Sequence, residues 1–297
     1  MAILIDRLTR GGMSVPIDPR AVGPRIRMML PNMSPLEVRI AEFLLRTDFD
    51  DTLPLKRAAD DSEVSEAMVV KTAKKLGFEG FRELRASLVQ YKQLPSVDLH
   101  REVTPEDTVE MILQKVFRTS IQALEETLAI LSIEAFKRAA DLIHTSRQRD
   151  FYGLGGSAQI ARDVAHKFLR IGIRASVFDD THMMAMSASL LGPGDLAIAF
   201  SHSGRSSGLV DAVQFAKGSG ASVIAVSNYD TGPIAELADV VLCSTAQGSP
   251  LTGENAAARI AQLNIMDSVF IAVAQKGYSH AEKNLASTMA AVQAKRR

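Results

Sequence analysis

The larger, C-terminal part of this chain alternates short apolar segments with longer stretches, and this alternation constrains the fold more than any other feature. The apolar segments lie at residues 150–153, 175–178, 196–201, 222–227 and 240–243. They lack the polar and apolar alternation of a half-exposed strand, which indicates a sheet covered on both faces. We therefore predict an α/β domain over residues 107–297, built on a five-stranded parallel doubly wound sheet in a flavodoxin-like strand order.

Apolar residues at helical spacing surround these strands. The predicted helices of the α/β domain lie at residues 107–130, 133–145, 157–171, 183–191, 207–218, 233–238 and 254–274. The first two precede the sheet, the last follows it, and the others connect consecutive strands as crossovers.

The N-terminal part shows a different pattern, in which helix start signals follow one another closely. Ser34, Pro35 and Glu37 have the arrangement of a capping box and predict a helix over residues 35–46. Ser65 caps a later helix that follows a short helix and a tight turn. This order is typical of an all-α helix-turn-helix domain. The remaining helices are expected at residues 54–60, 65–76 and 81–91.

Glycines, prolines and charges mark the domain boundaries. Residues 1–30 contain several helix-breaking glycines and prolines, and we interpret them as a flexible arm. The helix-turn-helix domain is assigned to residues 31–92. Residues 93–106 contain two prolines and no periodicity, as expected of a linker to the domain at 107–297.

Composition narrows the classes of function. The chain has 34 basic and 34 acidic side chains, so its overall charge gives no indication of nucleic acid binding. The single cysteine, Cys243, lies in a predicted strand, which excludes a disulfide framework. No apolar run reaches the roughly 18 residues of a membrane span, and the N-terminus does not resemble a signal peptide. We expect a cytoplasmic protein without a membrane partner.

Two loops that directly follow strands could hold an anion, because parallel sheets bind ligands at the carboxyl ends of their strands. Residues 201–207 carry four serines around Gly204 and precede a helix, whose N-terminus favours negative charge. Residues 153–157 are rich in glycine, which permits close backbone approach. We predict a phosphate site here, most simply for a sugar phosphate. A P-loop is excluded by the missing lysine motif. A dinucleotide site would need a third glycine in the loop at 153–157 and an acid that binds the ribose. The third glycine is missing and only Asp179 or Asp180 could serve as the acid, so this reading is disfavoured.

These motifs match a known family. The loops at 153–157 and 201–206 resemble those of the sugar isomerase (SIS) domain, and residues 64–81 resemble the helix-turn-helix signature of the MurR/RpiR family of bacterial transcriptional regulators. The resemblance implies a homodimer or homotetramer that binds operator DNA and a sugar-phosphate effector. It implies that Ser201, Ser203 and Ser206 hold the phosphate. The further ligand-binding residues that we expect are Gly155, Ser157, His182, Arg205 and Glu254.

The role of Glu254 stays open between two readings, a contact to sugar hydroxyls and capping of the last helix by charge. The helix-turn-helix carries basic residues for DNA phosphates and shorter side chains near the recognition helix start for base edges. The residues expected at the DNA are Arg57, Ser65, Glu66, Met68, Lys71, Thr72, Lys74 and Lys75.

Three positions depart from the family pattern. Met68 stands where threonine is usual, Glu63 where the turn usually has glycine, and Lys71 where arginine is commoner. The loss of a hydroxyl and of a bidentate guanidinium predicts an unusual operator preference.

The resemblance predicts a DNA-binding regulator, in the family's commoner mode a repressor of carbohydrate metabolism genes that a phosphosugar releases. The alternative is a sugar-phosphate isomerase or lyase, for which Glu254, His182 and His202 are the candidate bases. An attached DNA-binding domain favours sensing over turnover. We therefore expect no catalytic residue, no cofactor and no metal site.

Overall fold

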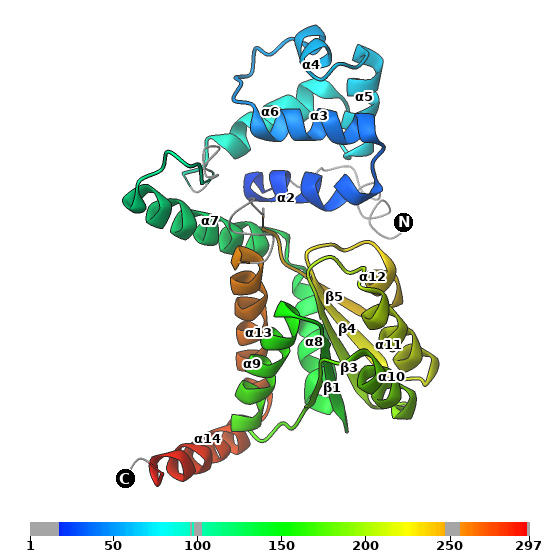
Figure 1. The fold of residues 1–297 in the computed structure, drawn as a ribbon, viewed down its shortest axis with the longest axis vertical. Coiled ribbons are helices and arrows are strands. Elements are labelled where there is room, and N and C mark those ends of the chain that lie inside the picture. The colour runs from blue at the N-terminus through cyan, green and yellow to red at the C-terminus, as the bar shows by residue number, and fades with distance from the viewer. Residues whose placement is uncertain (1–17, 96, 98–102, 247–255, 296–297) are drawn as a thin grey trace.

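The computed structural model describes residues 18–95, 97, 103–246 and 256–295. A helical domain lies above an α/β domain, and helix α7 runs between them (Figure 1). The fold class predicted from the sequence is confirmed.

The helical domain contains the predicted helix-turn-helix. Ser34 and Glu37 form the expected capping box, with Ser34 N–H donating to Glu37 Oε2 at 2.8 Å. Ser65 caps the recognition helix, and its Oγ accepts from the N–H of Met68 at 3.3 Å. The elements of this domain are α2 (Pro19–Met29), η1 (Leu30–Asn32), α3 (Pro35–Arg46), α4 (Leu55–Asp61), α5 (Glu66–Lys75) and α6 (Phe81–Lys92).

Helix α2 corrects the expectation of a flexible arm over residues 1–30, since 19–29 are helical and 1–17 lie outside the described residues. Val22 and Ile26 are buried in the core of the helical domain. A Cβ atom on Gly23 would lie 2.3 Å from Cζ of Tyr91, so glycine lets α2 approach α6 closely. The prediction failed because this glycine serves packing between helices rather than a turn.

The α/β domain has five parallel strands in the order β2-β1-β3-β4-β5, the flavodoxin-like order expected. In register, Phe151 of β1 lies beside Ile198 of β3, which lies beside Ile224 of β4. The strands are β1 (Arg149–Gly153), β2 (Ser176–Phe178), β3 (Leu196–Ser201), β4 (Ser222–Ser227) and β5 (Val240–Cys243). The helices are α7 (Val109–Ile130), α8 (Ile133–Thr145), α9 (Gly156–Arg170), α10 (Thr181–Leu190), α11 (Ser207–Gly218), α12 (Pro233–Leu237), α13 (Ala256–Lys276) and α14 (Tyr278–Gln293).

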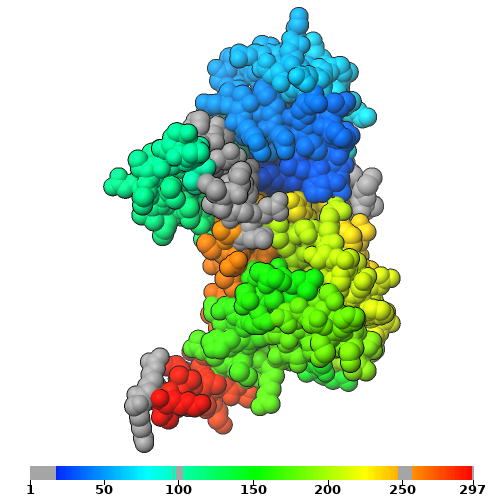
Figure 2. Space-filling view, viewed as in Figure 1, coloured from blue at the N-terminus to red at the C-terminus, as the bar shows by residue number. Residues whose placement is uncertain are grey.

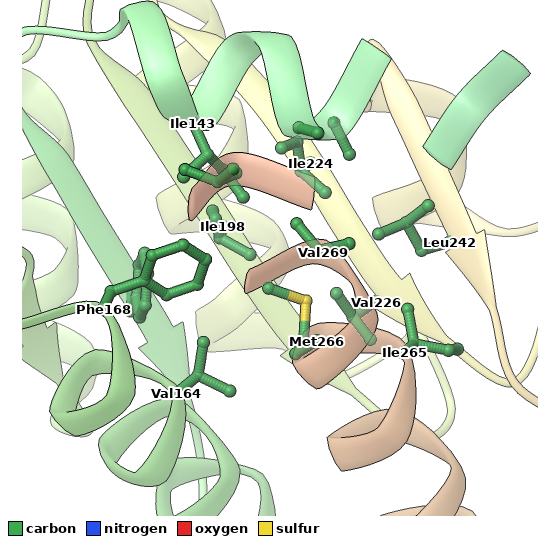
Figure 3. Close-up of a cluster of buried hydrophobic side chains, with 14 of the residues drawn as sticks. Ile143, Val164, Phe168, Ile198, Ile224, Val226, Leu242, Ile265, Met266 and Val269 are labelled. Carbon is green, nitrogen blue, oxygen red and sulfur yellow. The ribbon is translucent and has the colours of Figure 1, made fainter. Parts of the chain in front are cut away.

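Helices cover both faces of the sheet. On one face α8, α9 and α13 pack on the strands through side chains such as Phe168, Ile198 and Met266 (Figure 3). On the other face α10, α11 and α12 bury Met184 and Leu209 against the sheet. This two-layered cover explains why the strands are apolar throughout.

The C-terminus also departs from the prediction of a last helix at 254–274. Helix α13 extends to Lys276, and a further helix, α14, follows Gly277. Only Ala281 of α14 is buried, so this helix leaves little apolar periodicity in the sequence. Helix α13 is long and apolar enough to cross a membrane, but its side chains, among them Ile265 and Val269, form part of the core around the sheet.

Candidate functional site

The two predicted loops lie at the carboxyl edge of the sheet. In the first loop the backbone folds back tightly, because a Cβ atom on Gly153 would lie 2.8 Å from the carbonyl carbon of Ser157. Gly155, the N-cap of α9, has a φ of +54°, which disfavours other residues. Both glycines therefore shape a loop that brings Ser157, which is half-buried, to the start of α9.

The second loop is held in shape by its own serines. Ser201 Oγ accepts from the N–H of Gly204 at 3.0 Å, and Ser203 Oγ accepts from the N–H of Arg205 at 3.3 Å. Gly204 has a φ of +66°. The carbonyl of His202 accepts from the N–H of Asn228 at 3.2 Å, which anchors the loop beyond β4. Both serine hydroxyls still have a hydrogen to donate to an anion.

Ser206 is the N-cap of α11, yet its side chain makes no capping hydrogen bond. It is half-buried, and the helix N-terminus beside it favours negative charge. Arg205 is exposed, with its guanidinium carbon 3.7 Å from where a Cβ atom on Gly232 would stand. Serine hydroxyls, a helix N-terminus and a nearby cation are the groups that a phosphate binds.

One hollow joins the two loops to the start of α13. Ser157 of the first loop and His202 of the second lie on its wall, and the His202 ring packs edge-on against Tyr229 at 6.4 Å. The hollow is lined by Gly156, Ser157, Ile160, His202, Ala258, Arg259 and Gln262.

Arg259 and Gln262 of this hollow were not predicted from the sequence. They are polar residues three positions apart at the start of an otherwise apolar helix, a pattern that could have identified them. His182 is exposed on the first turn of α10, outside the hollow, and its N–H donates to Asp180 Oδ1 at 3.0 Å. Glu254 lies outside the described residues.

The recognition helix α5 presents part of the predicted DNA-binding set at its surface. Ser65, Glu66, Lys71 and Lys74 are exposed. Arg57 of α4 is also exposed and forms an ion pair with Asp61 at 3.5 Å. An exposed pair of this kind contributes little to stability, so this arginine can exchange its partner for a DNA phosphate.

Three residues of that set make contacts within the helical domain. Thr72 is fully buried, and its hydroxyl donates to the carbonyl of Met68 at 2.9 Å, which corrects the expectation that it contacts bases. Lys75 Nζ lies 2.7 Å from Glu37 Oε2. The hydrogen bonds from Lys75 and from the Ser34 backbone lower the pKa of Glu37. Met68 is half-buried against the domain core.

A buried polar cluster joins the helical domain to α7. Tyr91 Oη donates to Glu126 Oε1 at 2.5 Å, and Gln122 Nε2 donates to the same oxygen at 2.6 Å. The guanidinium of Arg27 pairs with the other oxygen of Glu126. Burial lowers the pKa of Arg27, but the Glu126 charge and the contributions of Tyr91 and Tyr229 together outweigh burial, so the net shift is upward. Arg27 therefore stays charged.

The next residue of α7 connects this cluster to the sheet. Thr127 Oγ1 accepts from the N–H of Thr245 at 3.0 Å. Thr245 follows β5, whose carboxyl end lies at the same edge as the two loops. Adjacent residues of α7, Glu126 and Thr127, thus contact the helical domain and the carboxyl edge of the sheet, respectively.

The comparisons with known protein families agree with this architecture. The family described as "Helix-turn-helix domain, rpiR family" matches residues 21–94, and the SIS domain family matches residues 142–272. Together they define a class of protein that combines a DNA-binding domain with a sugar-phosphate-binding domain.

The chain is 42% identical over 277 residues to the HTH-type transcriptional regulator RpiR of Escherichia coli K12. The aligned region covers 92% of this chain and 94% of that protein. It is 33% identical to an HTH-type transcriptional regulator of Caldanaerobacter subterraneus, over 89% of this chain and 94% of the relative. The chain belongs to the RpiR family of helix-turn-helix transcriptional regulators.

Solved structures share the fold. The Vibrio vulnificus NanR protein, complexed with ManNAc-6P, superimposes with a TM-score of 0.58 at 24% identity and covers 91% of this chain and 97% of its own. The sugar isomerase domain of an RpiR transcription factor from Sphaerobacter thermophilus superimposes with a TM-score of 0.56 at 23% identity. The match covers 60% of this chain and 97% of that structure.

Proposed function

We propose that this regulator represses carbohydrate metabolism genes from the cytoplasm and that a sugar phosphate bound at the serine loop releases it from operator DNA. The observation that carries the proposal is the arrangement of the loop itself. Ser203 and Ser206 stand at the N-terminus of α11, at the edge of the sheet where Ser157 also lies. Binding of ManNAc-6P by the structurally similar NanR protein supports this class of ligand.

The path from ligand to DNA runs through α7. A ligand at the sheet edge alters the loops around Thr245, and Thr245 bonds to Thr127. Glu126, the preceding residue, holds Arg27 and Tyr91 of the helical domain. For this path to regulate, the ligand must bind the DNA-competent and DNA-incompetent arrangements with different affinity.

A homodimer or homotetramer is part of the proposal, because paired recognition helices bind paired operator half-sites. Val109, Leu113, Phe117 and Ile121 recur every four residues along α7 and are 83%, 59%, 63% and 51% exposed. Figure 2 shows α7 as a lobe that projects from the molecule. An exposed apolar stripe of this kind marks an interaction surface, and we assign it to a second copy of the chain.

Turnover of the sugar phosphate is the competing function. It needs a base beside the carbon that loses a proton. His182 lies outside the hollow, and His202 packs against Tyr229. Sensing therefore explains the attached DNA-binding domain better than catalysis does.

The test is a thermal-shift screen against hexose, pentose, amino-sugar and keto-acid phosphates, since a ligand that binds only the folded state raises the melting temperature. A positive compound must lose its effect in Ser203→Ala and Ser206→Ala. Conversion of that compound by the purified protein, abolished by Glu254→Gln, would instead establish an enzyme. A Phe117→Glu variant that remained the same size in solution would refute the assigned dimer surface.

A further inference from the structure

Gln262 of α13 is an anomaly in the core of the α/β domain. Its side chain is 2% exposed, and its neighbours on the buried face of α13 include Ala261, Ile265 and Met266. Within the part of the chain that the structure describes, its amide Nε2 has no hydrogen-bond partner. Buried polar groups are almost always paired, because leaving one unpaired costs free energy. A buried, unpaired amide can be satisfied by a group that binds from solution.

The position of Gln262 supports this reading. It lines the same hollow as Ser157 and His202, at the meeting point of the two anion-binding loops. The amide thus lies beside the predicted phosphate site but on a different element of the fold. It does not belong to either loop.

Arg259 shares this wall. It stands one helical turn before Gln262, on the same face of α13. Its Nη2 atom lies 3.5 Å from where a Cβ atom on Gly156 would stand, so the guanidinium extends over the first loop. Within the described part of the chain it forms no ion pair, so its charge is free to meet a ligand. A cation and an amide therefore face one hollow from α13.

The chemistry of an amide indicates which part of the ligand it meets. A glutamine side chain presents one donor and one acceptor group, and a sugar hydroxyl can satisfy either, because it also donates and accepts. A phosphate oxygen can accept from the Nε2 donor, but only a hydroxyl can also donate to the amide oxygen. Ile160 and Ala258 complete the wall with apolar surface, which suits the carbon skeleton of a sugar.

We propose that Gln262 and Arg259 form a second subsite, which binds hydroxyl groups on the sugar part of the effector and so selects among sugar phosphates. This subsite rests on the proposed function, since it presupposes that the serine loops hold the phosphate. The phosphate gives the affinity that all such ligands share, and α13 distinguishes them.

The test compares two probes, inorganic phosphate and the sugar phosphate with the largest thermal shift, by calorimetric titration of the full chain. Gln262→Met keeps the length of the side chain and removes the amide. We expect about tenfold weaker binding of the sugar phosphate and an unchanged affinity for inorganic phosphate. Ser203→Ala should weaken both probes. Gln275→Met, an exposed position on the same helix, is the matched control.

The stability of the ligand-free variant gives a second readout. If the amide is unpaired until the sugar phosphate binds, Gln262→Met removes a buried polar group that has no partner. The melting temperature of the ligand-free protein should then be unchanged or higher. Gln262→Asn, which keeps the amide but withdraws it by one methylene, should fold and show the same selective loss. Equal binding of the sugar phosphate by Gln262→Met and the wild type would overturn the subsite. So would an equal loss for both probes.

The outcomes also separate the two proposals. If inorganic phosphate binds and every sugar phosphate binds no better, the sugar subsite is wrong and the phosphate site stands. If neither probe binds the wild type, both proposals fail.

Discussion

Replacement of Glu126 by glutamine should separate the two domains. The carboxylate accepts from Tyr91, Gln122 and Arg27, and the exposed fractions of the Arg27 and Glu126 side chains are only 10% and 4%. Glutamine can still accept from one neutral donor, but it leaves the buried guanidinium without a counter-charge. Removing one partner of a buried ion pair costs about 3–5 kcal/mol. At the lower limit, the docked arrangement loses roughly a factor of 150 in population.

Hydrogen exchange measures this loss, because α2 and α6 face α7 only in the docked arrangement. We expect faster exchange in α2 and around Tyr91 in Glu126→Gln, with protection of the sheet unchanged. Glu110→Gln, an exposed position on α7, serves as the control. The double replacement Arg27→Met with Glu126→Leu should restore part of the protection, since an apolar pair removes both charges but leaves the Tyr91 hydroxyl without its acceptor. Unchanged protection in Glu126→Gln would refute this account of how the domains are joined.

Three further predictions concern single residues. Glu63 has a φ of +53°, a backbone conformation that favours glycine. Glu63→Gly should therefore raise the free energy of unfolding of the helical domain by up to about 1 kcal/mol in denaturant unfolding. A lower free energy of unfolding would mean that the exposed ion pair of Glu63 with Arg39 contributes more than the backbone strain costs. Ser65→Ala should destabilise the same domain by about 1 kcal/mol by removing the cap of α5, and a neutral result would refute the cap's contribution. Burial raises the pKa of the Cys243 thiol, so a thiol reagent should react with it only after unfolding. Fast labelling of the native protein would contradict the buried position of this cysteine.

The strands and most helices were predictable because their signals are local. Buried parallel strands are short and apolar, and Ser34 and Ser65 cap their helices as the sequence indicates. The position of the two loops at the carboxyl edge of the sheet was predictable for a similar reason, since each directly follows an apolar strand.

The missed features depend on contacts between distant parts of the chain. Gly23 indicates a break in the sequence, and only its proximity to Tyr91 explains why it stands inside a helix. Lys75, which we predict to contact DNA, also pairs with Glu37, which lies 38 positions away in the chain, and no local pattern indicates this pair. Gln262 likewise becomes a site residue only when α13 is brought against the two loops.

The measurement that tests the central claim most directly is operator binding as a function of the effector. The operator DNA is taken from genomic fragments that bind to the immobilised protein. Fluorescence anisotropy then gives the affinity of the protein for this DNA at a fixed salt concentration. We predict that the sugar phosphate weakens DNA binding by the wild type and has no effect on the Ser203→Ala Ser206→Ala variant, which binds the same DNA equally well without ligand. A variant that still released DNA as the wild type does would contradict the claim that this loop senses the effector.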